Sequence, residues 1–207
     1  MYRPQHFNEP RTEVLQELIR QYSFGTLVSH VDGEMMASHL PFLLQGEGPQ
    51  GTLLAHVARA NPQWSAFRDG QQVLAIFHGP HAYVSPSWYE TELSVPTWNY
   101  AVVHAYGVPR LIEEVGELRE LLREMVGTFE DAFEQPWSLD RLPEEFLERQ
   151  MRAIVGFEIP ISRLEGKVKM SQNRLAVDRA GAARGLRQVG RPEAIQVAEW
   201  IERVNGE

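Results

Sequence analysis

The chain has 207 residues, 43% of them hydrophobic and 23% charged, which is the composition of one folded domain of ordinary size. Its formal net charge of −8 disfavours strong binding to nucleic acid, because such binding depends on neutralising phosphates with Lys and Arg. The sequence has no cysteine, no apolar run that could span a bilayer and no signal-peptide core near its first residue. We therefore expect a cytoplasmic protein without disulfides or a membrane partner.

The first half of the chain predicts a helix followed by closely spaced strands. Apolar residues recur at helical spacing over residues 11–22, and the next segment reads as a β-hairpin with a tight turn at Asp32-Gly33. Aromatic and β-branched runs separated by Gly, Pro and Asp predict further strands at 52–58, 73–77, 82–89 and 97–112. Short strands with turn signals between them are typical of an antiparallel barrel or sandwich.

The second half has a different character. Amphipathic patterns predict helices at 117–133, 142–151 and 191–204, and an apolar run predicts one more strand at 153–166. We expect a single α+β domain over residues 1–207, in which peripheral helices pack on an antiparallel β-barrel. Residues 173–207 form a C-terminal helical extension in this prediction.

The segment "HVARANPQW", residues 56–64, joins a predicted strand to a predicted helix start. Asn61 is a favoured N-cap residue, and Pro62 suits the first helical position. His56 and Arg59 lie just before this N-terminus, where unpaired N–H groups and a partial positive charge attract anions. This arrangement is one way to hold an anion, and the residues alone leave open whether an anion binds there and which one.

Several common site motifs are excluded. The run "GEGPQG", residues 46–51, matches G-x-G-x-x-G, but a strand follows it instead of a helix, so we interpret it as a hairpin loop. The 7 histidines show no metal-ligand spacing, and we expect surface or hydrogen-bonding roles for most of them and no metal site. The nucleophile elbow G-x-S-x-G is absent, so we assign no catalytic residue.

Two dense clusters remain open to more than one interpretation. Five Trp and Tyr side chains fall within residues 78–100 with prolines between them, and they suit either the core or a flat ligand or dimer interface. The run "EGKVKMSQNR", residues 165–174, supplies cationic and amide donors for an anion or for carbonyl oxygens, or else forms a capped surface turn. The wider basic stretch 163–191 is the best candidate for local DNA contact, although such stretches are often a solvated face.

The order of these blocks resembles the PaiB-type family of bacterial FMN-binding proteins, described as negative transcriptional regulators. The resemblance rests on blocks in residues 1–173, and two departures from the family pattern are Val108-Pro109 and Met170. The blocks that carry it are "MYRPQHF", "HVARANPQW", "FHGPHAYVSPSWY", "VPTWNY" and "EGKVKMSQN".

The resemblance implies a split β-barrel in which two subunits share two FMN sites across a homodimer interface. It implies that the anion at the helix start is the FMN 5′-phosphate, and that the strand "MMASHL" runs beside the flavin ring. The implied cofactor-binding residues are Ala37, Ser38, His39, His56, Arg59, Asn61, Trp88, Trp98, Asn99, Lys167, Lys169, Ser171 and Gln172.

Two classes of function follow from the resemblance. In the first, the protein is an FMN-binding negative transcriptional regulator, in which FMN biases contact with DNA or with another protein. In the second, it is an FMN-dependent oxidoreductase or flavin reductase; a haem-binding split barrel is a third reading. The fold does not decide between the first two, because split barrels host both. The acidic net charge weakens the case for DNA as a direct partner.

Overall fold

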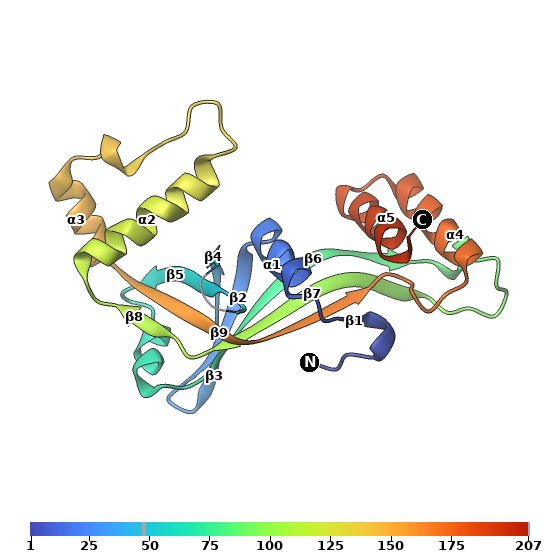
Figure 1. Ribbon diagram of the computed structural model, residues 1–207, viewed down its shortest axis with the longest axis horizontal. Coiled ribbons are helices and arrows are strands. Elements are labelled where there is room, and N and C mark those ends of the chain that lie inside the picture. Colours follow the sequence, from blue (N-terminus) through green and yellow to red (C-terminus); the bar gives the residue numbers. More distant parts are fainter. Residues whose placement is uncertain (47–48, 207) are drawn as a thin grey trace. The chain divides into compact units, whose positions relative to one another are not determined.

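The computed structural model describes residues 1–46 and 49–206 (Figure 1). Part of the predicted loop at 46–51 therefore lies outside the described residues. The chain divides into two compact units. Unit 1 comprises Met1–Leu18, His78–His104 and Glu165–Glu207, and unit 2 comprises Ile19–Phe77 and Ala105–Leu164.

Within the described residues, nine strands form one antiparallel network in the order β3-β2-β6-β7-β9-β5-β4. The short strands β1 (Asn8–Glu9) and β8 (Arg110–Ile112) both pair with β9 (Ile154–Lys169), which is the longest strand described. The path ends at β3 and at β4 and does not close on itself, as expected for a split barrel. Together with the helices this gives the α+β class that the sequence predicts.

In unit 2, β2 (Phe24–Val31) and β3 (Glu34–Pro41) form the predicted hairpin. Val31 pairs with Glu34, and the connecting Asp32 and Gly33 have φ values of 51° and 84°. Positive φ at both positions is what a two-residue turn between twisted strands requires, and Asp-Gly tolerates it well. The prediction of a hairpin at Asp32-Gly33 is confirmed.

In unit 2, the strands β4 and β5 are followed by a short helix. β4 (Leu43–Gln45) pairs with β5 (Thr52–Ala58), and β5 pairs along its whole length with β9. The helix after β5 is the 3₁₀ helix η2 (Pro62–Asp69), which begins at Asn61 as predicted and ends at Gly70 with φ 66°. Asn61 accepts a hydrogen bond from the Gln63 backbone N–H, so it is a true N-cap.

A helical pair covers one part of unit 2. α2 (Val115–Glu130) and α3 (Glu144–Arg152) lie near the predicted ranges, and the 3₁₀ turn η4 (Leu139–Arg141) joins them. Their apolar faces share a core with β5. Its buried members are Leu54, Leu118, Leu121, Met125, Leu139, Leu147 and Met151.

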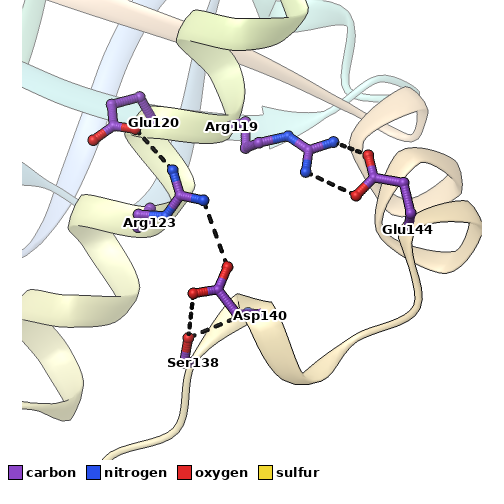
Figure 2. Close-up of polar contacts among 6 residues, drawn as sticks. All are labelled: Arg119, Glu120, Arg123, Ser138, Asp140 and Glu144. Atoms are coloured by element: carbon purple, nitrogen blue, oxygen red, sulfur yellow. Dashed lines mark hydrogen bonds and ion pairs between the residues drawn. The ribbon is translucent and has the colours of Figure 1, made fainter.

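Ion pairs also link α2 to the segment that leads into α3 (Figure 2). Arg119 forms a two-pronged ion pair with Glu144. Arg123 bridges Glu120 on its own helix and Asp140 on η4. These contacts are exposed and so contribute little stability singly, but they fix how α2 and η4 meet.

Unit 1 contains the larger parts of two long strands, β6 and β7, and the two C-terminal helices. β6 (Val73–Val84) runs without a break through Gly79-Pro80, where the sequence suggests two separate strands, and β7 (Thr97–Gly107) follows the 3₁₀ turn η3 (Pro86–Trp88). α5 (Pro192–Asn205) matches the predicted final helix. α4 (Ala176–Val189) lies inside the basic stretch and was not predicted as a helix of its own.

The N-terminal elements are short. The 3₁₀ turn η1 (Gln5–Phe7) and β1 precede α1 (Thr12–Gln21), which matches the predicted first helix. Leu15, Leu18 and Ile19 of α1 are at most 3% exposed, so its apolar face is the expected one. Among the described helices, none is long and apolar enough to cross a membrane.

Candidate functional site

The predicted site residues of unit 2 meet first at the start of η2. The Asn61 side-chain amide donates to Ser38 Oγ on β3 at 2.9 Å. The fully buried Gln63 donates to the carbonyls of Leu27 and Met36 and to Ser29 Oγ at 3.0 to 3.3 Å. Gln63 therefore ties the start of η2 to the β2–β3 hairpin, and it places Asn61 beside the strand predicted to run along the flavin.

Ala37 and His39 lie on the other face of β3. Both are exposed, and His39 Nδ1 lies 3.1 Å from Thr26 Oγ1 of the neighbouring strand. Side chains alternate along a strand, so Ser38 points away from the side that carries Ala37 and His39. β3 thus offers backbone and small side chains on one face and a hydrogen-bonded Ser38–Asn61 pair on the other.

His56 occupies the middle of β5, directly opposite Gly156 of β9. A Cβ added at Gly156 would lie 2.7 Å from Leu118 of α2, so the face that His56 shares is the one that the helical pair covers. The His56 Nδ1 atom is buried and has no hydrogen-bond partner. Burial lowers the pKa of His56, which favours a neutral imidazole.

Arg59 caps the C-terminal end of α3 by donating hydrogen bonds to carbonyls there. Its backbone N–H donates to the Ala153 carbonyl at 2.8 Å. Its Nε and Nη2 atoms donate to the carbonyls of Arg152 and Ile154, each also at 2.8 Å. A cation at a helix C-terminus satisfies carbonyls that have no partner within the helix. The guanidinium keeps its Nη1 group for a further acceptor.

In unit 1, the predicted lysines form a cationic group among aromatic rings. The Lys167 ammonium lies 5.5 Å from the Tyr2 ring and 5.4 Å from the Tyr100 ring. Lys169 contacts Thr97 Oγ1 and lies 6.0 Å from the Phe7 ring. Burial first, and then the charges of Lys167 and Arg174, lower the pKa of Lys169. Within the described part of the chain, neither ammonium is ion-paired with a carboxylate.

Asn99, Ser171 and Gln172 hold the turn that follows these lysines. Asn99 is fully buried and donates to Ser171 Oγ at 2.8 Å, while its Oδ1 atom has no hydrogen-bond partner. Ser171 has a φ of 63°, an uncommon conformation for a residue with a side chain. The Gln172 side chain accepts from the Met170 N–H and donates to the Val168 carbonyl.

The two predicted tryptophans differ in their surroundings. Trp88 is half-buried on α4, where Gly181 and Gly185 leave room for it. Trp98 is 53% exposed, and its ring lies near His81 at 5.8 Å and Tyr83 at 6.3 Å. Both tryptophans line a cavity of about 470 Å³ in unit 1, which has the size and aromatic character of a site for a flat ligand.

Within unit 1, the aromatic cavity and the two lysines are the kinds of group that an FMN cofactor needs. A fused apolar ring needs aromatic or backbone surfaces, and a phosphate needs cationic donors. Comparison with known families gives the same answer, because the profile of the family described as "Putative FMN-binding domain" matches residues 1–163. The chain belongs to this FMN-binding family.

The similar proteins include curated relatives and solved structures. The "Protease synthase and sporulation protein PAI 2" of Bacillus subtilis is 37% identical over 98% of this chain and 97% of its own length, which confirms the PaiB-type resemblance. An uncharacterised protein of Emericella nidulans is 32% identical over 96% of this chain and 95% of its own length. FMN is thus the cofactor of this FMN-binding family member.

Two solved structures share the fold at low identity. The flavocytochrome Anf3 from Azotobacter vinelandii has a TM-score of 0.62 and 14% identity, covering 82% of this chain and 72% of its own. The FAD- and heme-binding protein from Mycobacterium smegmatis has a TM-score of 0.60 and 15% identity, covering 84% and 79%. At this low identity, the similarity establishes the flavin split-barrel fold alone. It says nothing about whether the ligand or the activity is shared.

Two contributors to these sites were missed from the sequence: Gln63 holds the start of η2, and Asp178 holds the loop before β7. Tyr100, one of the five aromatic residues noted within 78–100, faces Lys167. Lys167 and Lys169, which the resemblance implies as cofactor-binding residues, are also the only lysines of the sequence. A lysine ammonium binds phosphate as a point charge, and an arginine guanidinium can bind two phosphate oxygens at once.

Proposed function

We propose that this protein is an FMN-binding, homodimeric regulator of negative transcriptional type, whose bound FMN biases contact with DNA or a protein. The observation that carries the proposal is the likeness, over nearly the whole chain, to a Bacillus protein named for protease synthesis and sporulation. That name refers to protease synthesis and to sporulation, and it mentions no flavin substrate. An FMN-dependent oxidoreductase is the second candidate, since a bound isoalloxazine ring supplies redox chemistry.

In this proposal the FMN phosphate lies at Lys167 and Lys169. A dianion there would offset two positive charges that no carboxylate in the described residues neutralises. It would also favour the charged form of Lys169, whose pKa burial lowers. Arg59, the phosphate ligand expected from the sequence, is the second candidate through its Nη1 group.

The remaining predicted residues are described within their own units. In unit 2, Ala37 and His39 lie on the exposed face of β3, and Ser38 with Asn61 holds that strand at η2. Asn99, Ser171 and Gln172 hold the turn that aims the lysines, and Trp98 offers an exposed aromatic surface. Burial under the helical pair lowers the pKa of His56 and favours its neutral form, and its buried Nδ1 atom has no hydrogen-bond partner.

FMN and riboflavin titrations test the phosphate site, because riboflavin lacks the phosphate. Lys167→Ala and Lys169→Ala should each weaken FMN binding roughly ten-fold or more, since a charge-assisted hydrogen bond contributes about 1.5–3 kcal/mol. Riboflavin affinity should stay unchanged, as should both affinities in Arg184→Ala, which changes an exposed arginine on α4. If Arg59→Ala weakened FMN binding but not riboflavin binding, the phosphate would be assigned to Arg59 instead.

The cationic stretch 163–191 bears on the choice of partner. Several of its arginines are engaged within unit 1: Arg174 stacks on Tyr89 at 4.7 Å, and Arg187 pairs with Glu202. With a net charge of −8 as well, non-specific DNA binding should be weak at physiological salt. A regulator of this kind would need sequence-selective contacts or a protein partner.

Selection of a random-sequence duplex pool on FMN-loaded protein tests the regulator against the enzyme. Enrichment of one sequence, with an affinity that changes when FMN is removed, would support the regulator. Steady consumption of NADH or NADPH by the loaded protein, without any enriched sequence, would favour the oxidoreductase. The visible spectrum of the same preparation separates flavin from haem, because only haem gives a Soret band.

The homodimer is supported by the outer face of the β2–β3 hairpin. Phe24 and Met35 on this face are 68% and 70% exposed, and Ala37 and His39 extend it along β3. Large apolar side chains exposed on an edge hairpin are unfavourable in water and are typical of a surface that another chain covers.

A further inference from the structure

A cavity of about 480 Å³ lies within unit 2, between η2, β8, the first turns of α2 and the end of α3. Its size is that of sites for small organic ligands. Of the residues predicted to bind FMN, only Arg59 lines it; the Ser38–Asn61 pair and His56 do not.

The floor of the cavity is apolar. Leu118, Met151 and Val155 are each less than 8% exposed, and Leu118 and Met151 belong to the core that the helical pair shares with β5. Ile112 and Leu111 of β8 complete this surface. A ligand seated here would remove hydrocarbon from water, which stabilises binding in proportion to the area covered.

The rim of the cavity carries an unbalanced positive charge. Arg68 pairs with Glu113 at 3.1 Å, and Arg152 pairs with Glu148 at 3.6 Å. Arg59 donates to backbone carbonyls and, in the described part of the chain, has no carboxylate partner. The lining residues therefore hold one guanidinium charge more than the carboxylates balance.

Arg59 is also held in place before any ligand arrives. Its Nε and Nη2 bonds to the Arg152 and Ile154 carbonyls fix the plane of the guanidinium at the end of α3. Its Nη1 group is left for an acceptor, so binding an anion there requires little loss of side-chain freedom.

We propose that this cavity binds a small organic anion with an apolar body, such as a medium-chain carboxylate, whose head group meets Arg59. Such a ligand matches both features of the site, the hydrocarbon floor and the unbalanced charge. The proposal does not rest on the phosphate site at Lys167 and Lys169, and it adds a second ligand to an FMN-binding protein.

Calorimetric titration of FMN-saturated protein with octanoate tests the proposal, with octanamide as the neutral probe of the same shape. Octanoate should bind at least ten-fold more tightly than octanamide, since only the carboxylate gains charge-assisted hydrogen bonds. Arg59→Ala should remove that preference and leave the weak octanamide binding.

Because Arg59→Ala also uncovers the end of α3, a second variant is needed. Val115→Trp narrows the cavity from the exposed first turn of α2 without touching Arg59, and it should reduce binding of both probes. Val177→Trp, on the exposed side of α4, adds the same side chain in unit 1 and should have no effect.

Three results would overturn the proposal. The first is no heat of binding at millimolar octanoate. The second is equal affinity for octanoate and octanamide in the parent protein. The third is weaker binding of FMN, with unchanged binding of riboflavin, in Arg59→Ala. This result would make the guanidinium part of the FMN site instead.

Discussion

The indole of Trp88 rests on Gly185 of α4, so closely that a Cβ at this glycine would overlap the ring. One turn earlier, a Cβ at Gly181 would overlap the Trp88 carbonyl oxygen. Two glycines four positions apart lie on the same face of a helix, and here they form the seat for one tryptophan. The contact joins η3 to the C-terminal helices of unit 1.

Replacing Gly185 by alanine should destabilise the protein. Overpacking against a rigid ring costs about 1–3 kcal/mol of unfolding free energy, which outweighs the gain in helix propensity of at most ~1 kcal/mol. Urea unfolding followed by tryptophan fluorescence measures the change. Gly127→Ala in α2 is the matched control, because no atom lies within 4 Å of its added Cβ, and it should stabilise slightly. Similar effects for both variants would contradict this account of Trp88.

Asp178 of α4 anchors the loop before β7. Its carboxylate is 1% exposed and accepts from the Glu90 and Thr91 backbone N–H groups and from the Thr91 hydroxyl, at 2.6 to 3.1 Å. Asp178→Ala should lower the unfolding free energy by about 1–3 kcal/mol or more, because buried N–H groups lose a charged acceptor. Asp178→Asn keeps an acceptor and should cost less.

The same carboxylate predicts a pH effect. The Thr91 hydroxyl is the main cause of the lowered pKa of Asp178. The stabilisation is therefore present above the unfolded value, about 3.9, and is lost as the pH falls below it. Asp178→Asn should flatten this acid limb of the stability curve measured by urea unfolding. An unchanged acid limb would show that Asp178 does not couple folding to protonation.

His56 predicts a second pH effect, in a different range. Burial lowers its pKa, so below about 6.5 the unfolded chain binds a proton that the folded chain does not. The unfolding free energy should therefore fall as the pH drops from 7 towards 5. In His56→Gln this part of the slope should disappear, whereas His6→Gln, at an exposed histidine in η1, should retain it. Equal slopes in the parent and both variants would rule out this role for His56.

The β2–β3 face predicts the oligomeric state. Light scattering at micromolar concentration should give twice the 23.7 kDa mass of one chain. Met35→Glu should shift the mass towards the monomer, because it places a charge in the covered patch. Leu93→Glu, at a loop position that is 95% exposed, is the control and should leave the mass unchanged. A monomer in the parent protein would refute the dimer, and a dimer in Met35→Glu would place the interface elsewhere.

Much of the fold follows from patterns that act over short distances. The Asp32-Gly33 turn, the Asn61 N-cap and the amphipathic helices near 12–21 and 192–205 each depend on residues within a few positions of one another. Local sterics and periodic burial decide such elements. α4 was not predicted as a helix of its own because its apolar face is built from Gly and Ala, which carry a weak hydrophobic signal.

The sequence by itself determined the family, the cofactor class and the positions of the cationic and aromatic blocks, because these depend on residue type and order. Only the tertiary structure decided which groups meet. Arg59 was expected to face a phosphate, yet its guanidinium binds carbonyls more than ninety positions away on α3 and β9. Asn99 reaches Ser171, and Glu90 reaches Asp178, over similar separations. Such contacts depend on strand register and helix packing across the whole chain, to which no local pattern is sensitive.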